Sequence, residues 1–308
     1  MNTAARLGLY GAGLLAIFGV SFAVAKPLVP DDAVSKWTAS ADTHGNHETT
    51  PAAAPDLMGL ASASGGFVLS RVEAPGTVDV GGTLSFRIDD TSGAPLTKYT
   101  TAHGKQLHLI VVRTDGSGFR HVHPQLNSTT GIWSMPWSWS NAGTYRVFVD
   151  FTPSSGNDSV TLSRTVDVAG DLRPDPRITA ATSSEVAGYS ATLSGDLRAG
   201  SSSHLTVAIS RNGVPVTSLQ PYLGAFGHLV VLRQGDLAYL HVHPMGDMPT
   251  ETGARSGPRI EFMATAPSVG RYLLYLDFQV DGIVHTATFV LDARRASAPA
   301  ADADHGAH

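Results

Sequence analysis

The chain has no cysteine among its 308 residues. This absence excludes disulfide bonds, thiolate metal sites and lipid attachment at an N-terminal cysteine. Any metal site must therefore use imidazole, carboxylate, thioether or backbone ligands. Charged residues are also scarce, at 15% of the chain, and the formal net charge is −5. The few Lys and Arg residues are scattered rather than gathered into a basic stripe, so the sequence predicts no nucleic-acid partner.

Motifs of nucleophilic catalysis are missing as well. The sequence contains no Gly-x-Ser-x-Gly motif, no cysteine nucleophile and no isolated pair of carboxylates at a fixed spacing. The central part of the chain also lacks a long amphipathic helix pattern. We therefore do not expect an enzyme, and we expect a fold built from strands.

The N-terminal segment contains an uncharged, apolar run from Leu7 to Ala25. As a helix, this run would be roughly 28 Å long, which is enough to cross the hydrocarbon core of a bilayer. Ala23-Val24-Ala25 also fits the cleavage site of a signal peptide. Residues 1–25 are thus expected to be a signal anchor or a signal peptide. Either one places the rest of the chain outside the cytoplasm, held by a single membrane pass or secreted after cleavage following Ala25.

Composition divides the remaining chain into four parts. Residues 26–66 are rich in Ala, Pro, Ser, Thr and Asp without periodicity, which predicts a flexible tether, and residues 294–308 predict a disordered, histidine-containing tail. Between them, short runs of Val, Leu, Tyr and Phe alternate with Gly, Pro, Asn and Asp turns, as is typical of β-strands. We expect an all-β fold with two tandem β-sandwiches, immunoglobulin-like or cupredoxin-like, at residues 67–170 and 177–293.

Two copies of one histidine pattern mark these two domains. The first copy reads Leu-His-Leu-Ile-Val-Val-Arg and then Phe-Arg-His-Val-His-Pro, and the second reads Gly-His-Leu-Val-Val-Leu-Arg and then Tyr-Leu-His-Val-His-Pro. Each histidine lies 120 positions from its counterpart (228 − 108). Retention of all three imidazoles, with the proline after the last one, indicates a site kept in both halves. The histidines are His108, His121 and His123 in the first copy and His228, His241 and His243 in the second.

Each copy is expected to form a β-hairpin. If the first pairs across the turn at residues 114–117, Ile110 lies opposite His121 and His108 lies opposite His123. The same register in the second copy places His228 opposite His243. Alternate side chains of a strand share a face, so three imidazoles can converge at each hairpin. Apolar residues complete these faces: Val112 and Phe119 in the first copy, Leu232 and Tyr239 in the second.

Three neutral imidazoles in one pocket suit Cu(I), Cu(II) or Zn(II). Asp150 and Asp277 recur at the end of a later strand, 127 positions apart (277 − 150), because the second repeat carries extra residues at about 246–257. For each aspartate we keep three roles open: a fourth metal ligand, an acceptor for an imidazole N–H, or the ion-pair partner of the duplicated Arg113 or Arg233.

Other histidines and methionines give weaker signals. His103, His204 and His285 have no partner in the repeat, and we expect structural roles for them. Met245 and Met248 follow the second histidine pattern and offer thioether ligands suited to Cu(I), although methionines in a loop usually have no such function.

Segments along nearly the whole chain resemble a family of uncharacterised, exported or membrane-anchored actinobacterial proteins with duplicated His-x-His-Pro β-domains. The resemblance implies an N-terminal membrane segment and paired domains. Because no established activity comes with it, it bears on localisation more than on mechanism. The segments that carry it are residues 9–14, 107–113, 121–124, 145–153, 219–228 and 241–244.

The sequence thus predicts an extracytoplasmic metal-binding protein with one site per domain, copper being preferred to zinc. Such a protein would buffer metal or hand it on at the cell envelope. The first alternative is a structural or interaction module that meets an envelope protein and binds no metal, and the second is a metal-dependent enzyme. Because ligand imidazoles must be neutral, binding is expected to weaken as the pH falls through roughly 6.5, the ordinary histidine pKa.

Overall fold

The computed structural model describes residues 59–156, 158–175, 179–240, 242–246, 249 and 253–295. The predicted signal segment (1–25), most of the tether (26–66) and nearly all of the tail (294–308) lie outside these ranges. Within the described ranges there is no helix long and apolar enough to cross a bilayer.

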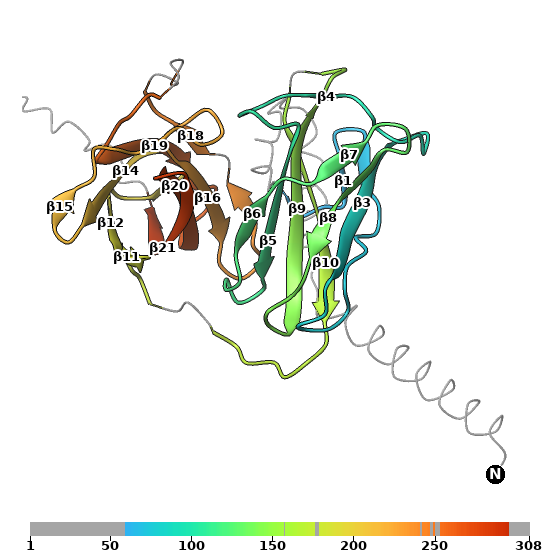
Figure 1. Cartoon of the computed structure of the whole chain (residues 1–308), viewed down its shortest axis with the longest axis horizontal. Coiled ribbons are helices and arrows are strands. Elements are labelled where there is room, and N and C mark those ends of the chain that lie inside the picture. Colours follow the sequence, from blue (N-terminus) through green and yellow to red (C-terminus); the bar gives the residue numbers. More distant parts are fainter. Residues whose placement is uncertain are drawn as a thin grey trace, which may run out of the picture. The chain divides into compact units, whose positions relative to one another are not determined.

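The first domain is a sandwich of two sheets (Figure 1). One sheet has the strand order β1-β2-β3-β8-β7, and the other has the order β10-β9-β5-β6 with β4 alongside β9. The strands are β1 (Ala63–Ser64), β2 (Phe67–Leu69), β3 (Gly82–Asp90), β4 (Tyr99–Thr100), β5 (Leu107–Arg113), β6 (Arg120–Val122), β7 (Gln125–Asn127), β8 (Ile132–Trp137), β9 (Gly143–Pro153) and β10 (Val160–Val168).

The second domain repeats this plan. Its sheets run β11-β12-β14-β19-β18, with β15 beside β14, and β13-β21-β20-β16-β17. The prediction of an all-β fold with two tandem sandwiches is confirmed. The strands are β11 (Ser183–Val186), β12 (Tyr189–Ser194), β13 (Arg198–Ala199), β14 (Ser202–Arg211), β15 (Val214–Pro215), β16 (His228–Arg233), β17 (Tyr239–Leu240), β18 (Val242–Pro244), β19 (Arg259–Thr265), β20 (Gly270–Val280) and β21 (Ile283–Arg295).

The two sheets of a domain differ in how many of their faces are buried. In β14, buried residues alternate with more exposed ones, because one face packs on the domain core and the other meets solvent. In β5 every residue from Leu107 to Arg113 is buried. A strand that is buried on both faces needs a second layer, and here the other domain supplies it.

A third hydrophobic core lies between the two sandwiches, in addition to one core within each. It contains residues of β5 and β9 from the first domain and of β16, β20 and β21 from the second. The apolar face that the sequence predicts for each hairpin is therefore the face on which the two domains pack. Its buried members are Ile110, Val112, Phe148, Val230, Leu232, Leu237, Leu273, Tyr275 and Val290, with Phe119 and Tyr239 packed against them.

Contacts in this interface come in equivalent pairs. Phe119 stacks on Tyr275 with ring centroids 4.0 Å apart and planes 3° from parallel. The counterpart pair is Tyr239 and Phe148, whose centroids lie 5.9 Å apart. The Tyr275 hydroxyl also donates a 2.6 Å hydrogen bond to the Gly116 carbonyl in the turn of the first hairpin. A Cβ at Gly116 would lie 2.5 Å from Leu273 Cδ1, and φ there is +85°, so close packing of the domains favours glycine in this turn.

Candidate metal centre

The first hairpin, formed by β5 and β6 and called hairpin one below, has the register that the sequence predicts. Leu109 pairs with Val122, and Ile110 pairs with His121. His123 follows directly after β6, where the chain crosses toward β7 in the other sheet. Two histidines at the end of one strand thus face His108 at the start of its neighbour.

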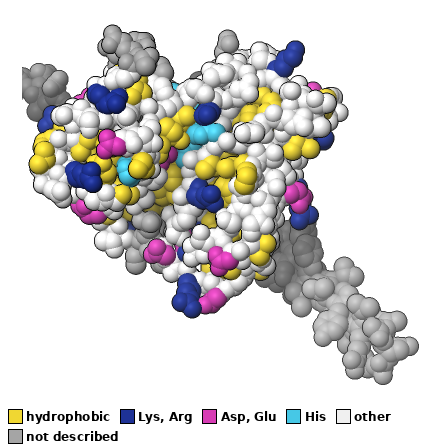
Figure 2. All heavy atoms as spheres, in the orientation of Figure 1, with side chains coloured by type: hydrophobic (Ala, Val, Ile, Leu, Met, Phe, Trp, Pro, Cys, Tyr) yellow, Lys and Arg dark blue, Asp and Glu magenta, His cyan; other side chains and the backbone are white. Residues whose placement is uncertain are grey.

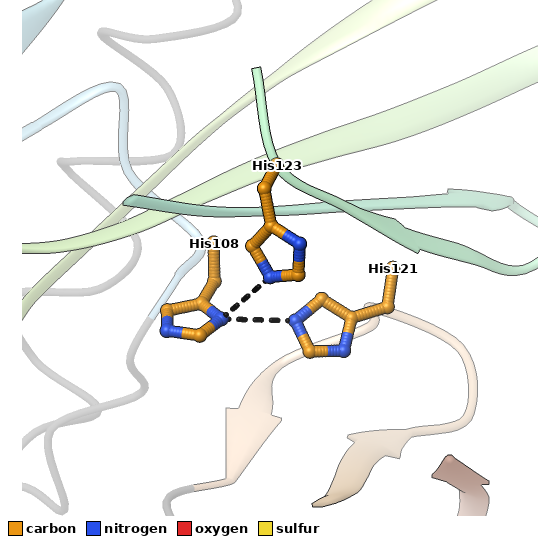
Figure 3. Close-up of side chains that lie close together, drawn as sticks. All are labelled: His108, His121 and His123. Carbon is orange, nitrogen blue, oxygen red and sulfur yellow. Dashed lines mark hydrogen bonds between the residues drawn. The ribbon is translucent and has the colours of Figure 1, made fainter. Parts of the chain in front are cut away.

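The imidazoles of His108, His121 and His123, called the triad below, converge on one point (Figure 3). His108 Nδ1 lies 3.0 Å from His121 Nε2 and 3.2 Å from His123 Nε2. The three nitrogens all lie within 4.8 Å of one another. Two nitrogen ligands of one tetrahedral zinc ion lie about 3.3 Å apart, so the triad has nearly the spacing that a bound ion requires.

The outward-facing nitrogens of two triad members are held by acceptors. His108 Nε2 lies 3.2 Å from the carbonyl oxygen of Ala102. His121 Nδ1 lies 2.9 Å from Asp277 Oδ2, and both side chains are only 4% exposed. Asp277 belongs to the second domain, so this hydrogen bond crosses the interface. Such outer acceptors fix the ring orientation and tautomer of metal-binding histidines.

These acceptors determine where the protons lie. A carbonyl and a carboxylate accept, so His108 carries its proton on Nε2 and His121 carries its proton on Nδ1. A neutral imidazole has one N–H, which leaves two lone pairs facing each other 3.0 Å apart, on His108 Nδ1 and His121 Nε2. Two such lone pairs repel unless a metal ion, or a proton on His121 Nε2, lies between them. The three convergent nitrogens form a donor set that fits a metal ion.

Burial favours the neutral form of His108, His123 and His228. It lowers the pKa of His108 to about 3, and the neighbouring His121 adds to the effect. Burial and the same neighbour lower the pKa of His123 to about 3. In the second domain, burial lowers the pKa of His228 to about 4. At His108 and His123, protons therefore compete with a metal ion only well below the pH of 6.5 expected for ordinary histidines.

The two recurring aspartates occupy equivalent places, each opposite a histidine of its own domain: Asp150 beside His108 and Asp277 beside His228. Asp277 also accepts a 2.6 Å hydrogen bond from Thr286. Asp150 accepts hydrogen bonds from Ser159 and Thr161.

The duplicated arginines bind other carboxylates. Arg113 pairs with Asp115 at 2.6 Å, and Arg233 pairs with Asp236. The ion pairs of these arginines with Asp150 and Asp277, one of the three roles kept open, are therefore not formed. For Asp277 the structure selects the role of acceptor for an imidazole N–H, and the imidazole belongs to the other domain.

The second hairpin, formed by β16 and β17 and called hairpin two below, departs from the prediction. The expected register holds where Val231 pairs with Leu240. The chain then leaves β16, and β18 pairs with β19 of the opposite sheet, with His243 opposite Met263. The predicted pairing of His228 with His243 is therefore wrong. His241 and the side chain of His243 lie outside the described residues, so their role as ligands stays a prediction.

His103 is the residue that the sequence analysis missed. Its ring centroid lies 5.4 Å from that of His228 and 6.2 Å from that of His108, so it belongs to the histidine cluster rather than to a separate structural position. It sits in a short loop with a left-handed backbone, and Leu223 has the same conformation in the second domain. The repeat thus extends to this loop. Position 223 is a leucine, so the 120-residue repeat of histidines does not point to His103.

Comparison with known families identifies the two halves of the chain. A family defined as a domain of unknown function, DUF8832, matches residues 67–170 and again residues 184–295. The chain belongs to this family. The duplicated domain of the sequence analysis is therefore the DUF8832 domain.

No curated protein matches the chain. Among solved structures, invasin, a bacterial integrin-binding protein, is 12% identical with a TM-score of 0.21, and the match covers 74% of this chain and 39% of invasin. Salmonella alpha-2-macroglobulin reacted with methylamine is 16% identical with a TM-score of 0.24, covering 78% of this chain and 15% of that protein. A putative membrane anchored protein from Corynebacterium diphtheriae is 8% identical with a TM-score of 0.22, covering 77% and 60%. The chain spans less than two thirds of each, and likeness this remote carries no argument about function.

Proposed function

We propose that this protein binds a transition-metal ion through His108, His121 and His123. The observation that carries the proposal is the convergence of three imidazole nitrogens within 4.8 Å of one another, with His108 Nδ1 and His121 Nε2 3.0 Å apart. Ala102 and Asp277 accept hydrogen bonds from the outer nitrogens, which directs the inner lone pairs of the neutral rings at each other. A cation bound there replaces a repulsion with two coordinate bonds.

Copper is the preferred ion and zinc the second choice. Neutral imidazoles suit both metals, and divalent copper binds a given nitrogen site more tightly than zinc. A cavity of about 70 Å³ borders His108 and His121 and has room for a water or another small ligand at a fourth position.

The proposed setting is outside the cytoplasm, where the protein buffers the metal or passes it on. The apolar run from Leu7 to Ala25 supports this location. We also propose that the chain is related to exported actinobacterial proteins. A second metal position at His228, His241 and His243 is part of the proposal.

Isothermal titration of the whole chain with copper and with zinc tests the proposal. The wild type is expected to bind at least one ion per chain, and His123→Ala is expected to lose that binding. His285→Ala serves as the matched control, because His285 packs on Tyr189 and Phe278 away from the triad. Absence of tight binding by the wild type, or equal binding by His123→Ala, contradicts the proposal.

The alternative is a structural module in which the buried histidines only hold the two domains together. The hydrogen bond between His121 and Asp277 favours it, because that bond joins the domains without any metal. Thermal unfolding separates the two functions. A metal-binding protein gains stability when copper or zinc is added, whereas a purely structural cluster gains none, and His121→Ala then lowers the melting temperature equally with and without a chelator.

A further inference from the structure

We propose that His103 and His228 form a two-histidine transfer position for monovalent copper, through which the ion reaches the triad. This inference rests on the metal-binding function proposed for the triad. It adds a coordination position whose two ligands come from different domains, and a defined route from solvent to the triad.

The first observation is a shared cavity. The cavity of about 70 Å³ beside the triad, called the inner cavity, is lined by His103 and His228 together with His108 and His121. The rings of His103 and His228 lie 5.4 Å apart, closer than either lies to a triad member: 6.2 Å from His103 to His108 and 6.4 Å from His228 to His121. An ion between the first two rings would be one short step from the triad.

The second observation is the free lone pair of His228. Its Nε2 donates a 2.8 Å hydrogen bond to the carbonyl of Tyr222, just as His108 Nε2 donates to Ala102. The proton is therefore on Nε2, and Nδ1 presents a lone pair. No hydrogen bond from a described residue reaches that Nδ1, so it can serve a metal ion.

The third observation is a route from solvent. A groove of about 400 Å³, called the outer groove, shares His103 and Pro244 with the inner cavity. Met245, 45% exposed, and Glu261 line this groove, along with the cationic Arg259. A thioether is a soft ligand that favours Cu(I). Figure 2 shows that histidine side chains reach the surface on this face of the molecule.

The number of ligands selects the metal. Zinc in proteins takes four ligands, so a position with two imidazoles holds it poorly. Cu(I) accepts two nitrogen donors. Transfer is a ligand exchange, in which a bond from copper to a triad nitrogen forms as a bond to His103 or His228 breaks, with no change in oxidation state.

Stopped-flow transfer of Cu(I) from its bicinchoninate complex to the whole chain tests this position. His103→Leu is the matched variant, because Leu223 holds the corresponding place at φ +53°, close to the +49° of His103. We expect transfer to slow at least about tenfold while the equilibrium affinity for copper changes less than about threefold. The rate of zinc binding is expected to stay unchanged. His103→Asn is a second variant whose residue also tolerates a left-handed backbone, and His285→Leu is the control.

Each outcome has one meaning. Unchanged Cu(I) transfer in both His103 variants overturns the transfer position and leaves the triad standing. Loss of equilibrium affinity in those variants also overturns it, because His103 would then be a resident ligand. Failure of the wild type to bind copper or zinc overturns the proposed function itself.

Discussion

Hairpin one and hairpin two have the same histidine spacing and different backbones. In hairpin one, β6 stays paired with β5 through Val122, and the chain joins the other sheet only at Gln125. In hairpin two, the chain has joined the other sheet by Val242, which corresponds to Val122. Equal spacing in sequence therefore does not guarantee an equal site, because the point at which a strand changes sheets decides which way its side chains face.

The two hairpins also depend on each other. His121 of hairpin one hydrogen-bonds Asp277, which is the cross-strand neighbour of His228 in hairpin two. Both domains thus contribute to the histidine cluster at their interface, and a separate site at His228, His241 and His243 stays a prediction.

The largest expected effect separates the hairpins directly. His121→Ala should weaken copper or zinc binding by more than about 100-fold, because loss of a ligand exceeds the 10–100-fold typical of losing its outer partner. His228→Ala, in hairpin two, should change the equilibrium affinity of the triad by less than about threefold. Competition titrations of both variants measure this difference. Equal losses would mean that one larger site includes His228.

A smaller effect tests the link across the interface. Asp277→Asn should weaken binding roughly 10–100-fold, because the amide no longer orients and polarises His121 as the carboxylate does. Asp150→Asn, the same change at the equivalent position, should leave the affinity of the triad nearly unchanged. Metal titration of the two variants provides the comparison. Loss of binding in Asp150→Asn alone would place the working site in hairpin two.

Acid should destabilise the metal-free protein through hairpin one. The pKa values of His108 and His123 are about 3 in the folded protein, whereas unfolded histidine has a pKa of about 6.5. Between these values the unfolded chain binds more protons, so the stability contribution is complete above pH 6.5 and is lost as the pH falls toward 3.

Melting temperatures from pH 7 to pH 4 measure this loss. His108→Gln has no titrating group at this position, so its difference from the wild type should shrink as the pH falls. A difference that stays constant with pH would show that His108 does not titrate as its burial requires.

The smallest effect concerns the packing between the domains. Tyr275→Phe introduces phenylalanine, which is the residue at the equivalent position of the first domain, Phe148. The change removes the hydrogen bond to the Gly116 carbonyl and should cost about 1 kcal/mol. That cost corresponds to a fall of roughly 2–4 °C in melting temperature when the two domains unfold together as one unit of about 200 residues. An unchanged melting temperature would show that water replaces the hydroxyl at no cost.

The sequence was sufficient to predict the fold and most of the geometry of hairpin one. Alternating and continuous apolar runs predicted strands, and a two-residue period with a four-residue turn predicted that Ile110 pairs with His121, as it does. The Asp277 contact was beyond such reasoning, because no periodicity shows which face of one domain packs on another. His103 was missed because its backbone position is repeated while its side chain is not.

The hydrogen bond between His121 and Asp277 has an evolutionary consequence. A single copy of the repeat carries both a histidine and an aspartate of this kind, but in the duplicated chain the two come from different copies. An unduplicated ancestor would complete this contact only by pairing with a second molecule across a twofold axis, and it would then do so twice. Fusion of the two copies fixes their ratio at one to one.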